Sequence, residues 1–261
     1  MDALRQIEEW GCEHAAAATG DARHGDVDHR FAWASVSKPA SAVAMLVAAE
    51  EGLVDLDEPA GPPGATFRHL LAHASGLPFD PGPAVARPGT RRIYSNAGFD
   101  AAADLVSVRA EMPFAEYFHT VWEGTGITLD GPASAAAHGT IEDLVALARE
   151  LSVPSRLAPE TLAEATSVQF PGLDGVLPGF GRQSPNDWGL GFELRDGKSP
   201  HWTGALNSPR TFGHFGRSGT FLWVDGDRWL CVLTDRAFGP WAAEAWPRLS
   251  DDVIGSLTQR S

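Results

Sequence analysis

The 261-residue sequence predicts an α/β (α+β) fold in which an antiparallel sheet, built from both ends of the chain and flanked by terminal helices, carries an inserted all-helical region. Strand-like segments occur near the N-terminus and in the last third of the sequence, and the middle is rich in helical patterns and breaker residues. We therefore expect a discontinuous sheet domain, residues 1–56 and 168–261, and a helical domain, residues 57–167.

The N-terminal part is predicted to contain a short helix, two strands and a longer helix. Residues 2–11 are amphipathic, and residues 14–19 and 29–34 have strand composition with a turn rich in glycine and aspartate between them. Residues 39–49 are apolar on almost every face, which is typical of a helix inside a domain. Gly52 is a suitable residue to end this helix.

Three more helices are predicted in the middle of the chain. Residues 66–76 begin with a threonine N-cap and end at a glycine, and a proline-rich loop covers residues 78–89. Residues 97–110 and 140–151 have helical patterns, and the second of these opens with a capping box that has aspartate in the usual glutamate position.

The last third of the sequence is predicted to supply most of the sheet. Three segments have strand composition: residues 188–194, 220–224 and 228–234. Residues 225–227 (DGD) separate the last two segments as a hairpin turn. A final helix follows from residue 241 onward and is interrupted by Pro247.

The bulk composition excludes several classes of function. A formal net charge of −14 and no basic run longer than Arg91-Arg92 argue against a nucleic-acid partner. The N-terminal residues lack the basic and apolar regions of a signal peptide, and no apolar run is long enough to span a membrane. The sequence therefore predicts a cytoplasmic protein with no membrane contact.

Ser35 and Lys38 form an S-x-x-K motif (SVSK) at the start of the apolar helix. Residues i and i+3 of a helix lie on the same face with Cβ atoms about 5–6 Å apart, so the lysine can reach the serine oxygen. A serine is activated when a base removes its proton, and an amine can be that base when burial lowers its pKa from about 10.4. The alternative is a serine N-cap followed by a surface lysine.

Two further segments carry residues suited to catalysis. Tyr94 and Asn96 lie in a predicted loop: a phenol can relay protons if cations lower its pKa, and an asparagine offers a donor and an acceptor to a substrate amide. Residues 213–219 (GHFGRSG) precede a predicted strand, where glycines let a substrate lie close to an edge strand and a backbone N–H can point into an oxyanion hole. The alternative for the first segment is a tyrosine packed on the surface. The alternative for the second is a glycine-rich entry to a strand in which the histidine has no function.

Taken in order, S-x-x-K, Y-x-N and H-x-G resemble the motifs of the serine β-lactamase and penicillin-binding-protein superfamily, in particular the branch of class C β-lactamases, D,D-peptidases and esterases. The resemblance covers residues 30–100 and 188–236 and implies a β-lactamase/transpeptidase-like fold with a shortened helical region. The similar flanking segments are FAWASVSK (31–38), EGLVDLD (51–57), HLLAHASGLP (69–78), PGTRRIYSN (88–96) and WGLGF (188–192).

The resemblance implies catalytic roles for three residues. Ser35 would form an acyl-enzyme, and Lys38 would accept its proton during the attack on the substrate. Tyr94 would shuttle protons to the leaving group and later help to activate the water that removes the acyl group.

The resemblance also implies substrate-binding roles. Asn96 would hold the acyl-side amide of the substrate, His214 and Gly216 would line the strand edge, and the backbone N–H groups of Ser35 and Arg217 would form the oxyanion hole. His214 stands where most class C β-lactamases have lysine, an exchange more typical of esterases and some peptidases. This exchange weakens recognition of a β-lactam carboxylate, although Arg217 places a positive charge nearby.

We therefore expect a serine hydrolase for small-molecule esters or amides, with esterase activity ahead of β-lactam hydrolysis. A weak β-lactamase or D,D-peptidase, an acyltransferase and a non-catalytic binding protein of the same fold are the alternatives. The chain is roughly a hundred residues shorter than a typical class C enzyme, which predicts an open site with loose substrate selection. The sequence leaves the oligomeric state open.

No cofactor or metal is predicted. The histidines are scattered, and His69 with His73 is the one i, i+4 pair that could place two imidazoles on one helix face. Because this segment matches a structural segment of the superfamily, capping and packing are the preferred roles for the pair.

Overall fold

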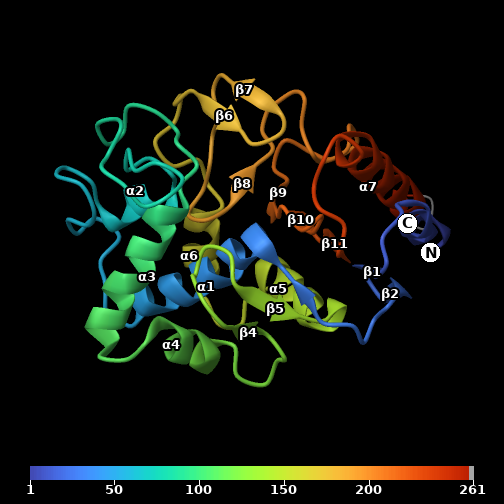
Figure 1. The fold of residues 1–261 in the computed structure, drawn as a ribbon, viewed down its shortest axis with the longest axis horizontal. Helices are drawn as coiled ribbons and strands as arrows, with labels where there is room; N and C mark the ends of the chain where they lie inside the picture. The colour runs from blue at the N-terminus through green and yellow to red at the C-terminus, as the bar shows by residue number, and fades with distance from the viewer. Residues whose placement is uncertain (259–261) are drawn as a thin grey trace.

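The main sheet of the protein joins the two ends of the chain. The computed structural model describes residues 1–258 and has a six-stranded sheet in the order β2-β1-β11-β10-β9-β8, in which each neighbouring pair with a recorded register is antiparallel (Figure 1). The predicted antiparallel sheet is therefore confirmed. Its strands are β1 (Ala15–Thr19), β2 (Ala22–Gly25), β8 (Glu193–Leu194), β9 (Phe212–Phe215), β10 (Phe221–Asp225) and β11 (Arg228–Thr234).

The sheet separates two hydrophobic cores. Successive residues of a strand point to opposite faces, so Cys231 and Leu233 enter one core whereas Leu230 and Val232 enter the other. The helices α1 (Ser37–Glu50) and α5 (Ile141–Ser152) cover the first face. The 3₁₀-helix η1 (Asp2–Glu9) packs with α7 (Ala242–Thr258) on the second face, so the first and last helices lie side by side (Figure 1).

The remaining helices lie mostly at the end of the molecule away from the termini (Figure 1). α5 falls within residues 57–167 but packs on the main sheet, and the division into two domains stays a prediction. The other helices are η2 (Ala34–Val36), α2 (Phe67–Leu71), α3 (Asn96–Ala110), α4 (Phe114–Val121) and α6 (Pro159–Ala165). A three-stranded sheet has the order β3-β5-β4, with β3 at Phe31–Ala32, β4 at Thr128–Leu129 and β5 at Ala137–Gly139. A two-stranded sheet consists of β6 (Gly175–Leu177) and β7 (Gly181–Gln183).

Several predicted elements differ from the structure near glycines and other left-handed residues. Residues 22–25, predicted as a turn, form β2 because a tight turn at Gly20 (φ +52°) lets Ala22 pair directly with Thr19. The predicted helix 66–76 ends at Leu71, since His73 has a φ of 55° that no α-helix accommodates.

The predicted strands 29–34 and 188–194 are both shorter in the structure. The first is reduced to β3, which pairs with β5 outside the main sheet. The second is reduced to β8, because Gly191 has a φ of +84° and donates its N–H to the Leu71 carbonyl oxygen instead of to a neighbouring strand.

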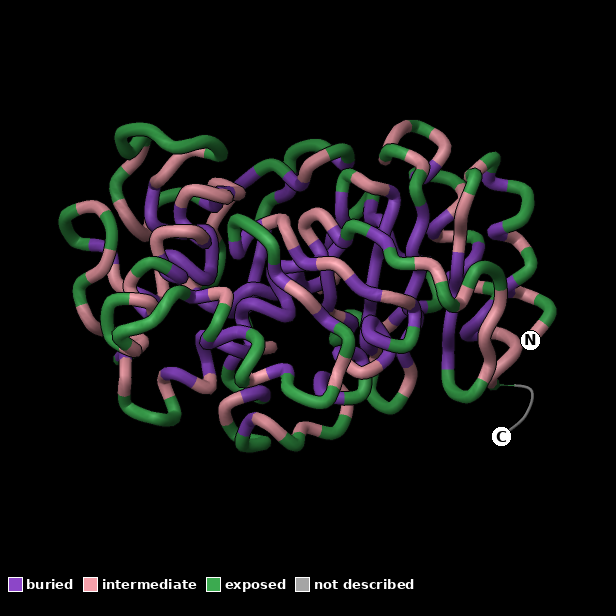
Figure 2. Tube along the Cα trace, turned by 60° about the horizontal axis from the view of Figure 1, so that its bottom comes forward, coloured by how far each residue is buried: buried purple, intermediate pink, exposed green. Residues whose placement is uncertain are grey.

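The predicted burial of the central helix is confirmed. Buried segments run through the middle of the molecule and exposed segments lie at its outer turns (Figure 2). Ser37 to Leu46 of α1 are buried without a break, so the lysine at the start of the helix has no contact with bulk water. Among the helices of residues 1–258, none is both long and apolar enough to cross a membrane.

Candidate active site

Ser35 lies in the tight turn η2 that connects β3 to α1. The residue before it, Ala34, has a φ of 47°, a left-handed conformation that costs a residue with a side chain about 1 kcal/mol or more. Ser35 itself is half-buried, whereas its neighbour Ser37 is fully buried and uses its hydroxyl to bond the Ala34 carbonyl oxygen at 2.6 Å. The strained turn therefore presents Ser35, and not Ser37, at a surface that a substrate can reach.

The hairpin between β9 and β10 holds this turn in place. The hydroxyls of Ser218 and Thr220 donate to the carbonyl oxygens of Ala32 and Trp33 at 3.0 and 2.9 Å. A Cβ atom at Gly216 would lie 2.6 Å from the Trp33 carbonyl oxygen, so only glycine permits this approach. In this structure Gly216 contacts the turn that contains Ser35, and its predicted contact with substrate stays a prediction.

Lys38 is fully buried, so the alternative of a surface lysine is wrong. Its Nζ donates to the side-chain oxygen of Asn96 at 2.6 Å and to the carbonyl oxygen of Ser134 at 2.9 Å, and it lies 4.7 Å from the centre of the Tyr94 ring. Burial lowers the pKa of Lys38 to about 7, although the negative charge of Asp100 opposes this shift. A neutral amine keeps one lone pair, and the two acceptors take up its two N–H groups, so the lone pair is left to accept a proton.

Asp100 is a residue of this site that the motifs did not reveal. Its two carboxylate oxygens accept hydrogen bonds from the backbone N–H and the hydroxyl of Ser134 at 2.9 and 3.0 Å. This pair of bonds fixes the carbonyl group that holds Lys38. Asp100 lies one helical turn after Asn96 on α3, and this i, i+4 spacing is the only signal in the sequence that could have linked it to the site.

Tyr94 and His214 form a polar pair beside Ser35. The Tyr94 hydroxyl lies 3.4 Å from Nε2 of His214, while Nδ1 of His214 donates to the Phe215 carbonyl oxygen at 2.7 Å. Burial, together with the charge of Lys38, lowers the pKa of His214 to about 3. His214 is therefore neutral at pH 7, with its free ring nitrogen able to accept a hydrogen bond from Tyr94.

The condition under which a phenol at position 94 could relay protons, a pKa lowered by cations, is not met. Burial raises the pKa of the Tyr94 phenol well above its ordinary value, and a hydrogen bond with Ser35 offsets this only in part. Tyr94 therefore keeps its proton at neutral pH and is suited to donate it, whereas Lys38 is the group that is ready to accept one.

The two histidines of the HLLAH segment have structural contacts. His69 completes a capping box with Thr66 at the start of α2, which confirms the capping role. His73 is fully buried: its Nδ1 accepts from the backbone N–H of Ser95 at 3.2 Å, and its ring packs 4.7 Å from that of Tyr94. Within residues 1–258, no group of three or more His, Cys, Asp or Glu side chains is placed to hold a metal ion.

A cavity of about 150 Å³ brings four of the predicted residues together: Ser35, Tyr94, His214 and Arg217 line it. Lys38 and Asn96 reach the site through contacts with the Tyr94 ring and with each other. β8 pairs with Phe212 and Gly213 of β9 and stops short of His214, and the predicted contact of His214 with substrate along this edge stays a prediction. The guanidinium-bearing Arg217 is exposed at this edge.

A network of buried charges lies behind this edge and has no signal in the sequence. Glu193 of β8 forms an ion pair with Lys198 and accepts hydrogen bonds from His201 and Trp202 at 2.8 and 2.9 Å. Burial would raise the pKa of Glu193, but His201 and Lys198 outweigh it and lower the pKa to about 2. Because Glu193 pairs with Gly213, the network fixes the strand residue next to His214.

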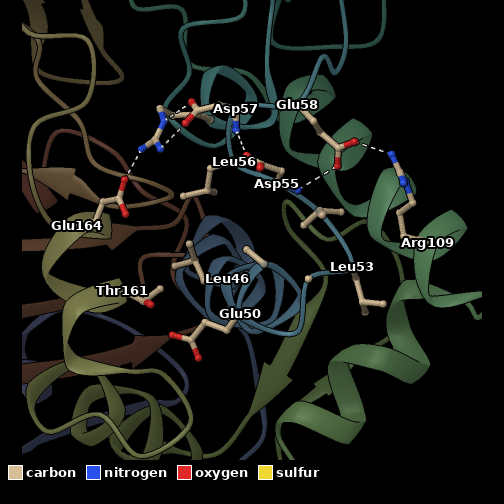
Figure 3. A pocket seen from close by; sticks show the side chains of 14 residues that line it. Leu46, Glu50, Leu53, Asp55, Leu56, Asp57, Glu58, Arg109, Thr161 and Glu164 are labelled. Atoms are coloured by element: carbon tan, nitrogen blue, oxygen red, sulfur yellow. Dashed lines mark hydrogen bonds and ion pairs between the residues drawn. The ribbon is translucent and has the colours of Figure 1, made fainter.

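A larger hollow of about 540 Å³ lies elsewhere, at the C-terminal end of α1 (Figure 3). Its charged residues bind one another: Arg68 lies 2.8 Å from Asp57 and 2.7 Å from Glu164, and Arg109 lies 2.5 Å from Glu58. Among the described residues, those that line it include none from the three motifs. The smaller cavity at Ser35 is therefore the candidate active site.

The main sheet combines strands from both ends of the chain, and a serine and a buried lysine lie at the start of the helix next to it. This arrangement is that of the β-lactamase/transpeptidase-like fold, whose members are typically serine hydrolases. The chain belongs to the Beta-lactamase family, whose model matches residues 5–245. No sequence among the curated proteins matches it.

Solved structures agree with this family. A β-lactamase from Mycobacterium bovis is 51% identical with a TM-score of 0.95, and the match covers 98% of this chain and 99% of that one. EstCE1, a hydrolase with promiscuous acyltransferase activity, has 17% identity and a TM-score of 0.77, with 97% of both chains covered. A penicillin-binding protein from Bacillus halodurans has 16% identity and a TM-score of 0.73, with 98% and 99% covered.

Proposed function

We propose that this protein hydrolyses small-molecule esters through an acyl-enzyme on Ser35. The observation that carries the proposal is the buried amine of Lys38, which has a pKa of about 7 and two fixed acceptors, one turn of helix from a half-buried serine. At neutral pH a large fraction of this amine is unprotonated and can act as a base. A surface lysine with its ordinary pKa could not do so.

The reaction begins when Ser35 Oγ attacks the ester carbonyl carbon and passes its proton to Nζ of Lys38. The carbonyl oxygen becomes an oxyanion, which the backbone N–H groups of Ser35 and Arg217 stabilise. As the carbon–oxygen bond to the leaving group breaks, Tyr94 donates its proton to the departing alcohol, and the ammonium of Lys38 restores the proton on Tyr94. Neutral His214 accepts a hydrogen bond from Tyr94 and orients its hydroxyl.

Deacylation repeats these steps with water in place of Ser35. As the water attacks the acyl carbon it gives its proton to Tyr94, which passes its own proton to neutral Lys38, and Ser35 Oγ then leaves with the proton that Lys38 returns. Asn96 has two tasks in this scheme, because its side-chain oxygen holds Lys38 and leaves its NH₂ group to bind the substrate.

Esters are favoured over β-lactams because His214 carries no charge. A carboxylate at this position would meet a neutral ring instead of a cation, so it would lose a charge-assisted hydrogen bond of about 1.5–3 kcal/mol. The 51% identity to a chain described as a β-lactamase favours β-lactam hydrolysis as the second candidate, with the exposed Arg217 as the partner of the carboxylate.

Intact mass spectrometry after exposure to a fluorophosphonate and to p-nitrophenyl butanoate tests the proposal. We expect one adduct on the wild type, an adduct on Ser37→Ala, and none on Ser35→Ala. An adduct that persists in Ser35→Ala would show that another residue is the nucleophile. Nitrocefin, assayed beside the ester, separates the two candidates, and binding of both compounds without any acylation would identify a non-catalytic member of the fold.

A further inference from the structure

The cavity at Ser35 has walls that the proposed chemistry does not use. Apart from its four polar residues it is lined only by apolar side chains, and these come from separate parts of the chain. Phe79 follows α2, Leu177 and Pro178 belong to the β6–β7 hairpin, Trp188 and Phe215 flank the sheet edge, and Phe238 follows β11.

Packing fixes the size of this cavity. The ring of Phe238 contacts those of Phe215 and Trp246, with centroids 5.4 and 5.3 Å away. A Cβ atom at Gly179, which has a φ of +79°, would lie 2.5 Å from the Phe238 ring, so the tip of the hairpin rests directly on it. Leu177 is fully buried in the hydrophobic core against which Phe238 packs. The wall is therefore close-packed and cannot expand freely around a larger ligand.

The volume and the lining together define what fits. An apolar cavity of about 150 Å³ is large enough for one benzene ring. The cation at its edge, Arg217, is exposed to water, so a charged group placed deep in the cavity would lose its hydration without a partner. A compact uncharged group gains from burial, and each added methylene improves its binding about fourfold.

The position of the cavity indicates which half of the ester it holds. The acyl group stays attached to Ser35 through both half-reactions, whereas the leaving group must diffuse away after the first. The apolar part of the cavity beside Ser35 therefore suits the acyl group, and the exposed side of the cavity at Arg217 suits the departing alcohol.

We propose that the cavity formed with Leu177 and Phe238 is an acyl-binding pocket, and that the substrates are esters of compact, uncharged acids of about six carbons, either aromatic or branched. This inference rests on the proposed function for its chemistry. The pocket itself is a statement about binding and can be tested without turnover.

The first experiment measures kcat/KM for p-nitrophenyl acetate, butanoate, benzoate and decanoate, each divided by the alkaline hydrolysis rate of the same ester. We expect the corrected kcat/KM to rise about fifteenfold from acetate to butanoate, to stay high for benzoate, and to fall for decanoate. Leu177→Trp fills the pocket and should reduce the butanoate-to-acetate ratio to about one. Leu177→Ala should move the optimum to longer chains.

Val176→Trp is the matched control, because Val176 is the neighbouring residue on the same strand and is 58% exposed. Its ester ratios should equal those of the wild type. Hydrolysis without any dependence on acyl size, or the same change in Val176→Trp as in Leu177→Trp, would overturn the pocket while leaving the proposed function intact.

The second experiment uses calorimetry on Ser35→Ala with ethyl benzoate and ethyl acetate as probes. We expect ethyl benzoate to bind at least tenfold more tightly, and Leu177→Trp in the same background to remove this difference. If no ester is turned over but this preference holds, the proposed function fails and the pocket stands. Equal binding of the two esters would overturn the pocket directly.

Discussion

The pH dependence of ester hydrolysis should report the interaction between Asp100 and Lys38. Lys38 must be neutral to accept the proton of Ser35, so kcat/KM should rise with pH through a pKa of about 7. The negative charge of Asp100 favours the ammonium form and raises this pKa. Asp100→Asn removes the charge, and its amide can still accept from the Ser134 N–H and donate to the Ser134 hydroxyl.

The size of the effect follows from the path between the two charges. Ser134 links the carboxylate of Asp100 to the amine of Lys38 through hydrogen bonds to both groups. With roughly 8 Å between the two charges and an effective dielectric constant of about 20, their interaction is about 2 kcal/mol. Asp100 is partly exposed, and solvent screening reduces this to about 1 kcal/mol, slightly less than one pKa unit. The acidic limb of the profile should therefore move to lower pH by about half a unit to one unit.

The assay is kcat/KM for p-nitrophenyl butanoate across the pH range around 7, followed at the isosbestic wavelength of p-nitrophenol. Asp104→Asn is the control, because Asp104 is exposed on the next turn of α3 and its profile should match the wild type. An acidic limb that stays in place in Asp100→Asn, or that moves to higher pH, would refute the role of Asp100. A lower plateau with an unmoved limb would indicate a purely structural effect.

Three further changes test the charges of the site. Lys38→Met should abolish hydrolysis and should have a higher free energy of unfolding than the wild type at pH 6. The folded lysine, with a pKa of about 7, loses its proton at lower pH than the unfolded one, so the stability of the wild type rises above pH 7. The difference in free energy of unfolding between the two proteins should therefore narrow by roughly 2–3 kcal/mol at pH 9 in urea titrations. A difference that does not change with pH would contradict this reasoning. Glu193→Gln leaves the buried charge of Lys198 unpaired and should cost about 3–5 kcal/mol in chemical denaturation, with part of the loss recovered when Lys198→Met is added. Equal stability of the single and double variants would show that the pair is not coupled. His214→Lys supplies a cation and should raise the ratio of nitrocefin to butanoate kcat/KM by about tenfold, and an unchanged ratio would mean that carboxylate recognition does not depend on this residue.

The sequence predicted the parts of the molecule that depend on local patterns. The apolar run after Lys38 correctly predicted a buried helix, and Thr140 with Asp143 correctly predicted a capping box. The three motifs also predicted residues that the structure places around one cavity or in contact with its walls. Their catalytic roles stay predictions until an acyl-enzyme is measured.

The features that the sequence missed depend on contacts between distant segments. Ser134 binds Lys38 through its backbone carbonyl, a group that every residue has, so no side-chain pattern marks it. Glu193 and Lys198 resemble ordinary surface charges until the fold encloses them. The pKa of Tyr94 rises because the folded chain buries the phenol, and this burial outweighs the hydrogen bond with Ser35.

The pairing of β1 with β11 has a consequence for how the chain is made. Ala15 lies opposite Thr234, so the first strand has no partner in this sheet, apart from β2, until almost the whole chain has left the ribosome. Contacts of such high sequence separation form slowly, because a long loop must close before they stabilise the structure. The helix α5 is synthesised earlier and must wait for β10 and β11, against which its buried face packs. A nascent chain stalled before β11 would therefore expose this helix to chaperones and to aggregation.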